Sequence, residues 1–169
     1  MTASLRILTA AALCLGLCAA VAPADAKGAK DPAVRAQMRQ LLRDFRTQRR
    51  TIQDQVVTCG KDYLTSVGVA LQLDDAGQDA LETQLDAAYE LAEDRFEALP
   101  EADQLPATLR SYILAELKTV TDGATADAAI QAQLDGYSTT FVDCVLPLKA
   151  QIATLRSDTR TQIRTLLGK

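Results

Sequence analysis

Apolar residues recur at spacings of three and four along the chain from residue 31 onward. This spacing places them on one face of an α-helix. Four helices are predicted in this way, over about 32–71, 75–99, 107–121 and 125–167. Short stretches that contain aspartate, glycine or proline separate them. The predicted fold class is therefore all-α, a four-helix bundle whose long first and fourth helices form an antiparallel pair.

Local signals place the helix ends. Asp31 caps the first helix with Pro32 at its first position, and Asp75 with Gln78 resembles a capping box at the start of the second. Pro147 should kink or break the fourth helix. The stripes of the two long helices are Val34, Met38, Leu41, Leu42, Phe45, Ile52, Val56, Cys59, Tyr63 and Val67 in the first, and Ile130, Leu134, Tyr137, Phe141, Cys144, Leu148, Ile152, Leu155, Ile163 and Leu166 in the fourth.

The first 26 residues have the pattern of a secretory signal peptide. Arg6 precedes an apolar run over 7–22, and an Ala-Asp-Ala cleavage signal ends at Ala26. Residues 27–169 are then predicted to form a single helical domain in the periplasm of a bacterium or outside the cell. The alternative is a lipoprotein modified at Cys14 or Cys18, although each follows a leucine where the lipidation signal prefers a small residue.

Two cysteines lie beyond the leader, Cys59 and Cys144, and both fall on the apolar stripes. An oxidising compartment favours a disulfide between them. The alternative is two buried free thiols that act as small apolar residues. In an antiparallel pair with this disulfide, the numbers of facing residues add to 203, and the ends of the two helices come out level. Gly60 would let the backbones approach, and the outer halves of the pair would protrude as a two-helix stalk.

Charge is distributed unevenly along the chain. Residues 31–50 carry six arginines and two aspartates, and residues 149–169 carry five basic side chains and one aspartate. Residues 74–103 carry eleven carboxylates and one arginine. The basic segments are therefore the two ends of the predicted helix pair, and the acidic segment is the second helix.

The arginines of both long helices fall on one flank of their stripes, and these flanks face each other in an antiparallel pair. The candidate binding residues are Arg35, Arg39, Arg43, Arg46, Arg156, Arg160 and Arg164. They would line a groove for an anionic partner: a lipid head group, lipopolysaccharide, a polyanion or an acidic protein. The alternative is a solvated basic face, neutralised at its inner end where Glu93, Asp94 and Glu97 come near Arg49 and Arg50.

Several kinds of chemistry have no residues to support them. The chain has no histidine, which excludes a Ser-His-Asp triad and imidazole ligands. It has no Cys-x-x-Cys pair and no glycine-rich phosphate loop. The carboxylates of 74–82 do not have the spacing of a calcium-binding loop. We therefore expect a protein that is not an enzyme, with no cofactor, no metal and no nucleic-acid partner.

Three functions remain as hypotheses: a binding protein that uses the arginine groove, a structural or self-assembling envelope module, and a chaperone-like stress protein. The last follows from the stretch "LDDAGQ", Leu73 to Gln78. It resembles the LTxxQ motif of small periplasmic helical proteins of the Spy and CpxP type. It has aspartate in place of threonine and its glutamine one residue late, and no second copy precedes the fourth helix.

Overall fold

A computed structural model describes residues 31–168. Within this range the elements are α3 (Pro32–Ala70), α4 (Asp75–Glu97), the short 3-10 helix η2 (Glu101–Asp103), α5 (Pro106–Ala124) and α6 (Ala128–Leu166), with no strand. The predicted all-α four-helix bundle is confirmed. The predicted signal peptide lies outside the described residues.

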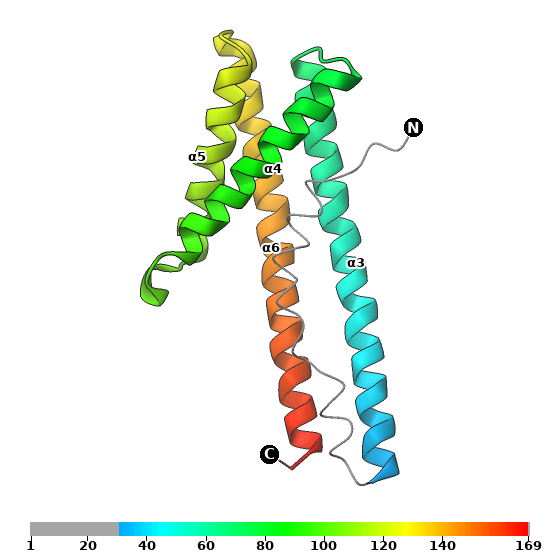
Figure 1. Cartoon of the computed structure of the whole chain (residues 1–169). Helices are drawn as coiled ribbons and strands as arrows, with labels where there is room; N and C mark the ends of the chain where they lie inside the picture. The colour runs from blue at the N-terminus through cyan, green and yellow to red at the C-terminus, as the bar shows by residue number, and fades with distance from the viewer. Residues whose placement is uncertain (1–30, 169) are drawn as a thin grey trace.

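The two long helices α3 and α6 lie side by side and run antiparallel over their whole length (Figure 1). Each has 39 residues. Cys59 of α3 and Cys144 of α6 form a disulfide with their Cα atoms 6.2 Å apart. The predicted antiparallel pair and its disulfide are therefore both confirmed.

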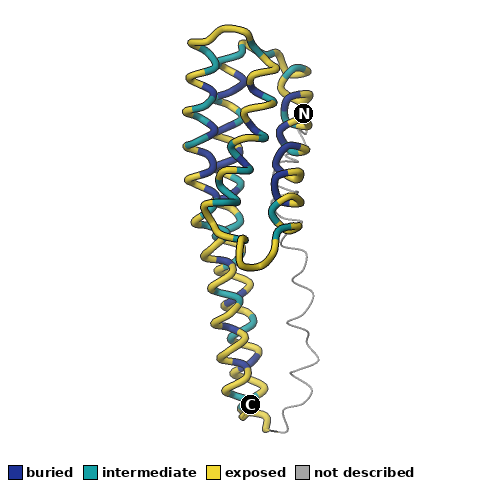
Figure 2. Tube along the Cα trace, turned by 90° about the vertical axis from the view of Figure 1, so that its left-hand side faces the viewer, coloured by how far each residue is buried: buried dark blue, intermediate teal, exposed yellow. Residues whose placement is uncertain are grey.

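Helices α4 and α5 cover only one end of this pair. In Figure 1, α4 leaves the end of α3, crosses in front of α6 and returns as α5. Figure 2 shows that the opposite end of the molecule consists of α3 and α6 alone. We call residues 51–149 the head, and residues 31–50 with 150–168 the stalk.

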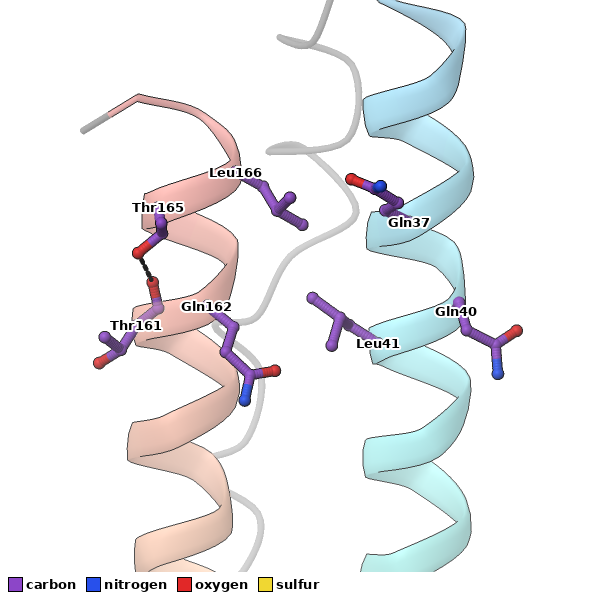
Figure 3. A pocket seen from close by; sticks show the side chains of 7 residues that line it. All are labelled: Gln37, Gln40, Leu41, Thr161, Gln162, Thr165 and Leu166. Carbon is purple, nitrogen blue, oxygen red and sulfur yellow. Dashed lines mark hydrogen bonds between the residues drawn. The ribbon is translucent and has the colours of Figure 1, made fainter.

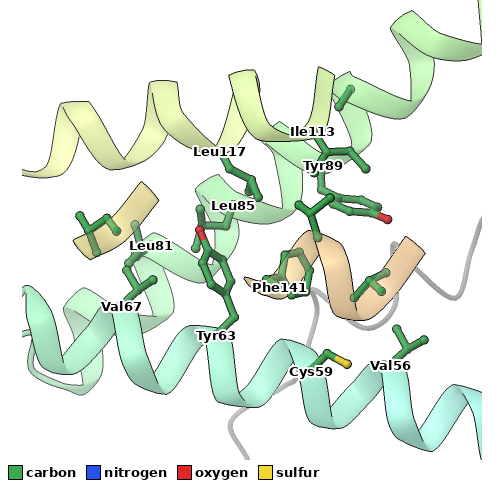
Figure 4. Close-up of a cluster of buried hydrophobic side chains, with 14 residues drawn as sticks. Val56, Cys59, Tyr63, Val67, Leu81, Leu85, Tyr89, Ile113, Leu117 and Phe141 are labelled. Atoms are coloured by element: carbon green, nitrogen blue, oxygen red, sulfur yellow. The ribbon is translucent and has the colours of Figure 1, made fainter. Parts of the chain in front are cut away.

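The head encloses the larger core, to which all four helices contribute (Figure 4). Tyr63 stacks on Phe141 with ring centroids 4.8 Å apart, and the edge of Tyr89 contacts the same phenylalanine. The Tyr63 hydroxyl lies 3.0 Å from Ser138 Oγ in a buried hydrogen bond. Burial raises the pKa of Tyr63 to about 12, although the bond to Ser138 opposes the shift.

The stalk buries a much narrower strip. Met38 and Ile163 form one buried cluster there. The partly buried residues packed against it are Val34, Leu41, Leu42, Leu166 and Leu167. Phe45, Ile152 and Thr159 continue the buried strip toward the head. The pairing of Met38 with Ile163 agrees within two residues with the register that the disulfide sets.

The turn between α3 and α4 corrects one predicted cap. Asp74, not Asp75, caps α4, and its carboxylate accepts a hydrogen bond from the Gly77 amide at 2.8 Å. The Gln78 side chain instead packs on Gly68, where an added Cβ would lie 3.2 Å from it. The predicted capping box is wrong because the helix begins at Asp75, one residue earlier than a cap at Asp75 would require.

The later helix boundaries also differ from the prediction. Helix α5 continues through Gly123 to Ala124, and α6 starts at Ala128 after its cap Asp127. Helix α6 passes through Pro147 without a break. A single proline removes one hydrogen bond, and the packing of both flanking segments against α3 offsets that loss.

Cys144 does not lie on the buried face of α6, as the stripe predicted. Residue 144 is exposed, while Phe141, Val142 and Val145 are buried. A disulfide can join Cα atoms more than 5 Å apart, so its sulfur reaches Cys59 from the edge of the interface. The larger valines then occupy the interface itself.

Candidate functional site

The predicted arginines lie on one flank of the stalk. Arg49 of α3 and Arg156 of α6 are half-buried, because each lies seven residues from an inward-facing residue: Arg49 from Val56, and Arg156 from Ile163. Residues seven apart occupy the same helical position, and equivalent positions of an antiparallel pair face each other. The other candidate arginines are exposed and extend this surface. We call the seven candidate residues the arginine flank: Arg35, Arg39, Arg43, Arg46, Arg156, Arg160 and Arg164.

The stalk core supports the predicted levels of these residues. The disulfide register sets Arg39 opposite Arg164. Met38 and Ile163 belong to one buried cluster, which agrees with that register within two residues, or about 3 Å along the helix. Arg43 and Arg160 follow one turn nearer the head, since four residues advance a helix by about 6 Å.

Most arginines of the flank have no acidic partner. Among residues 31–168, no carboxylate forms an ion pair with Arg39, Arg46, Arg160 or Arg164. Arg43 donates a hydrogen bond of 2.6 Å to the neutral Gln40 Oε1. The flank therefore keeps its positive charge, and its guanidinium groups present donors to the solvent.

The basic residues of the head are arranged differently, because most of them are neutralised. Arg110 contacts Asp143 at 2.9 Å, and Lys118 contacts Asp135 at 2.9 Å. Arg95 pairs with Glu116 between α4 and α5. These hydrogen bonds raise the pKa of Arg110 and of Lys118 and lower the pKa of Asp143.

The expected neutralisation of Arg49 and Arg50 by α4 is not found, since neither arginine forms an ion pair within residues 31–168. Glu93 is buried and forms an ion pair with Lys149 of α6. The Lys149 ammonium also lies 4.7 Å from the centre of the Tyr89 ring. Burial disfavours charge on Lys149, but Tyr89 and Glu93 outweigh it and raise the pKa of the lysine. Asp94 and Glu97 are exposed and have no ion pair within residues 31–168.

The opposite flank of the stalk holds a groove that the sequence did not predict (Figure 3). It has a volume of about 510 Å³ and no charged residue in its lining, which consists of Gln37, Gln40, Leu41, Thr161, Gln162, Thr165 and Leu166. The available signal was the run of glutamine and threonine on the sides of the two stripes that lack arginine. The stalk therefore has two unlike flanks, one cationic and one neutral.

Two structural findings limit the chemistry of the described part of the chain. Residues 31–168 contain no group of three histidine, cysteine, aspartate or glutamate side chains placed to hold a metal ion. None of the helices in this range has both the length and the apolar character that a membrane crossing requires.

Comparison with known proteins adds no further constraint. No protein-family model, no curated protein and no solved structure matches the chain. A functional interpretation therefore depends on the geometry and charge described above.

Proposed function

We propose that this protein is an exported, non-enzymatic binding protein that holds an anionic partner on the arginine flank of its stalk. One observation carries the proposal: α3 and α6, far apart in sequence, bring their arginines to the same flank, and most of these arginines pair with no carboxylate among residues 31–168. Like charges on neighbouring turns of a helix repel each other, and a bound anion would relieve that repulsion.

The charge of the whole stalk supports this function. Residues 31–50 and 150–168 carry nine arginines against Asp31, Asp44 and Asp158, a net charge of +6. All the basic side chains are arginines, whose planar guanidinium groups suit carboxylate, phosphate and sulfate oxygens. Each candidate partner presents such oxygens on its surface. The candidates are a lipid head group, lipopolysaccharide, a polyanion and an acidic protein.

The test is retention on a column that carries a sulfated polysaccharide. The wild-type protein should bind at low ionic strength and elute as sodium chloride rises, because salt screens contacts between exposed charges. The variant R39Q/R43Q/R160Q/R164Q should elute with the unbound fraction. These side chains are exposed, so the variant should keep its helical content by circular dichroism.

A matched control removes the same charge from the head. The variant K61Q/R95Q/R110Q/K118Q has the same net charge as the stalk variant, and the ion pairs that it breaks are largely exposed and contribute little to stability. It should be retained nearly as well as wild type. Equal loss of retention in both variants would show that net charge matters and that the arginine flank does not.

A further inference from the structure

Helix α4 carries a row of acidic residues that has the same spacing as a row of arginines on α3. Glu90, Asp94 and Glu97 lie four and three residues apart on α4. We call these three residues the acidic row. All three are exposed.

The matching residues of α3 are three arginines of the stalk. Arg39, Arg43 and Arg46 also lie four and three residues apart, and all are exposed. We call them the basic row. At 1.5 Å per residue, charges in both helical rows recur roughly every 4.5 to 6 Å. Both rows have the order four then three, so they match when the two helices lie parallel.

The two rows do not meet within one molecule. Helix α4 turns away from α3 at its start and crosses toward α5, so its acidic end lies far from the lower part of α3 (Figure 1). Within residues 31–168, no residue of either row forms an ion pair. Each molecule therefore exposes two complementary rows, and neither is neutralised by another residue in the described part of the chain.

The total charges of the two regions favour contact between unlike regions. The head carries 18 acidic and 5 basic side chains, a net charge of −13, and the stalk has +6. Two heads repel each other, and so do two stalks, whereas a head attracts a stalk. Such complementarity selects partner and orientation.

We infer that a partner of the arginine flank is a second copy of this chain, with the basic row of one molecule along the acidic row of the next. This inference rests on the proposed function and names its partner. The contact joins two different surfaces, so it is heterologous, and repetition adds copies head to tail. Exposed ion pairs are weak and screened by salt, so association should need high protein concentration and low ionic strength.

Sedimentation velocity of the disulfide-bonded protein tests the inference. At roughly 20 mM salt, the sedimentation coefficient of wild type should rise with protein concentration. At about 0.5 M salt it should not change with concentration, because salt screens the charges. Two charge-reversed variants should each remain monomeric at low salt: E90R/D94R/E97R, in which both rows are basic, and R39E/R43E/R46E, in which both are acidic. An equimolar mixture of the two should associate.

The variant that combines all six reversals is the decisive control. Its net charge equals that of wild type, and its rows are again complementary with their signs exchanged. It should associate as wild type does. If it stays monomeric while wild type associates, or if either three-residue variant associates as wild type does, the rows are not the contact.

The outcome also separates this inference from the proposed function. A wild-type protein that is monomeric at low salt but retained on the polysaccharide column would overturn self-association and leave anion binding by the arginine flank intact. Association that the six-residue variant restores, without retention on the column, would support self-association and contradict a general anion site.

Discussion

The head and the stalk are built from the same two helices, yet they differ in what covers them. In the head, α4 and α5 cover the α3–α6 pair and enclose a core from all four helices. In the stalk, the same pair buries a single strip around Met38 and Ile163. Most of the burial that stabilises the fold therefore lies in the head, whereas the stalk presents an open, positively charged surface.

The head and the stalk also differ in how many of their basic side chains form ion pairs. In the head, Arg95, Arg110, Lys118 and Lys149 contact carboxylates. In the stalk, most arginines contact no carboxylate among residues 31–168. Neutralised cations are suited to joining helices, whereas cations without partners are suited to binding. Three changes below should sharpen this comparison, in order of decreasing effect on stability.

Removal of the disulfide should have the largest effect. The bond closes a loop over 85 positions of sequence that contains α4 and α5. The variant C59S/C144S should lose about 4 kcal/mol of unfolding free energy, since the open chain gains entropy when it unfolds. Urea denaturation without reductant measures this loss.

Hydrogen exchange of the same variant would locate the effect. Amides of α4 and α5, which the loop contains, should lose protection along with the rest of the head. A loss of less than about 1 kcal/mol would show that the helices hold the head closed without the bond.

Cavities in the two cores should have the second largest effect on stability, and the cost should differ between head and stalk. Leu85 in the head and Met38 in the stalk are both 1% exposed. We expect Leu85→Ala to cost about 3 kcal/mol, because four helices cannot collapse onto the space, and Met38→Ala about 2 kcal/mol, because two helices can. Thermal or urea unfolding of both variants measures the difference. Equal costs would contradict the view that the stalk core is the more adaptable.

Alkaline pH should weaken the head through Tyr63. Its pKa is about 12 in the fold against 10.0 for an ordinary tyrosine, so the folded state keeps the hydroxyl protonated. Stability from this group is complete below pH 10 and is lost as pH rises toward 12. Between pH 8 and 11 the loss should be about 1.4 kcal/mol.

The variant Tyr63→Phe isolates this effect. It should lose about 1 kcal/mol at neutral pH, because Ser138 loses its partner, but its stability should fall less between pH 8 and 11 than that of wild type. Tyr137→Phe, at a half-buried position of α6, serves as the control. An unchanged pH profile in Tyr63→Phe would assign the alkaline loss to other groups.

The sequence alone determined the helices, their approximate ends, the disulfide and the flank on which the arginines lie. These features depend on local rules: the helical period assigns each residue to a face, and aspartate or proline marks the starts at Asp31 and Pro32. The disulfide then sets the register of two helices whose local pattern is already determined, and the cluster of Met38 with Ile163 agrees with that register within two residues.

Only the tertiary structure decided where α4 goes. Packing of Tyr89 on Phe141 and the pair of Glu93 with Lys149 hold α4 across α6. Helical periodicity does not specify a crossing direction, because that depends on how side chains of separate helices fit together. The crossing carries Asp94 and Glu97 away from the arginines of the stalk, and so leaves both charged rows on the surface of one molecule.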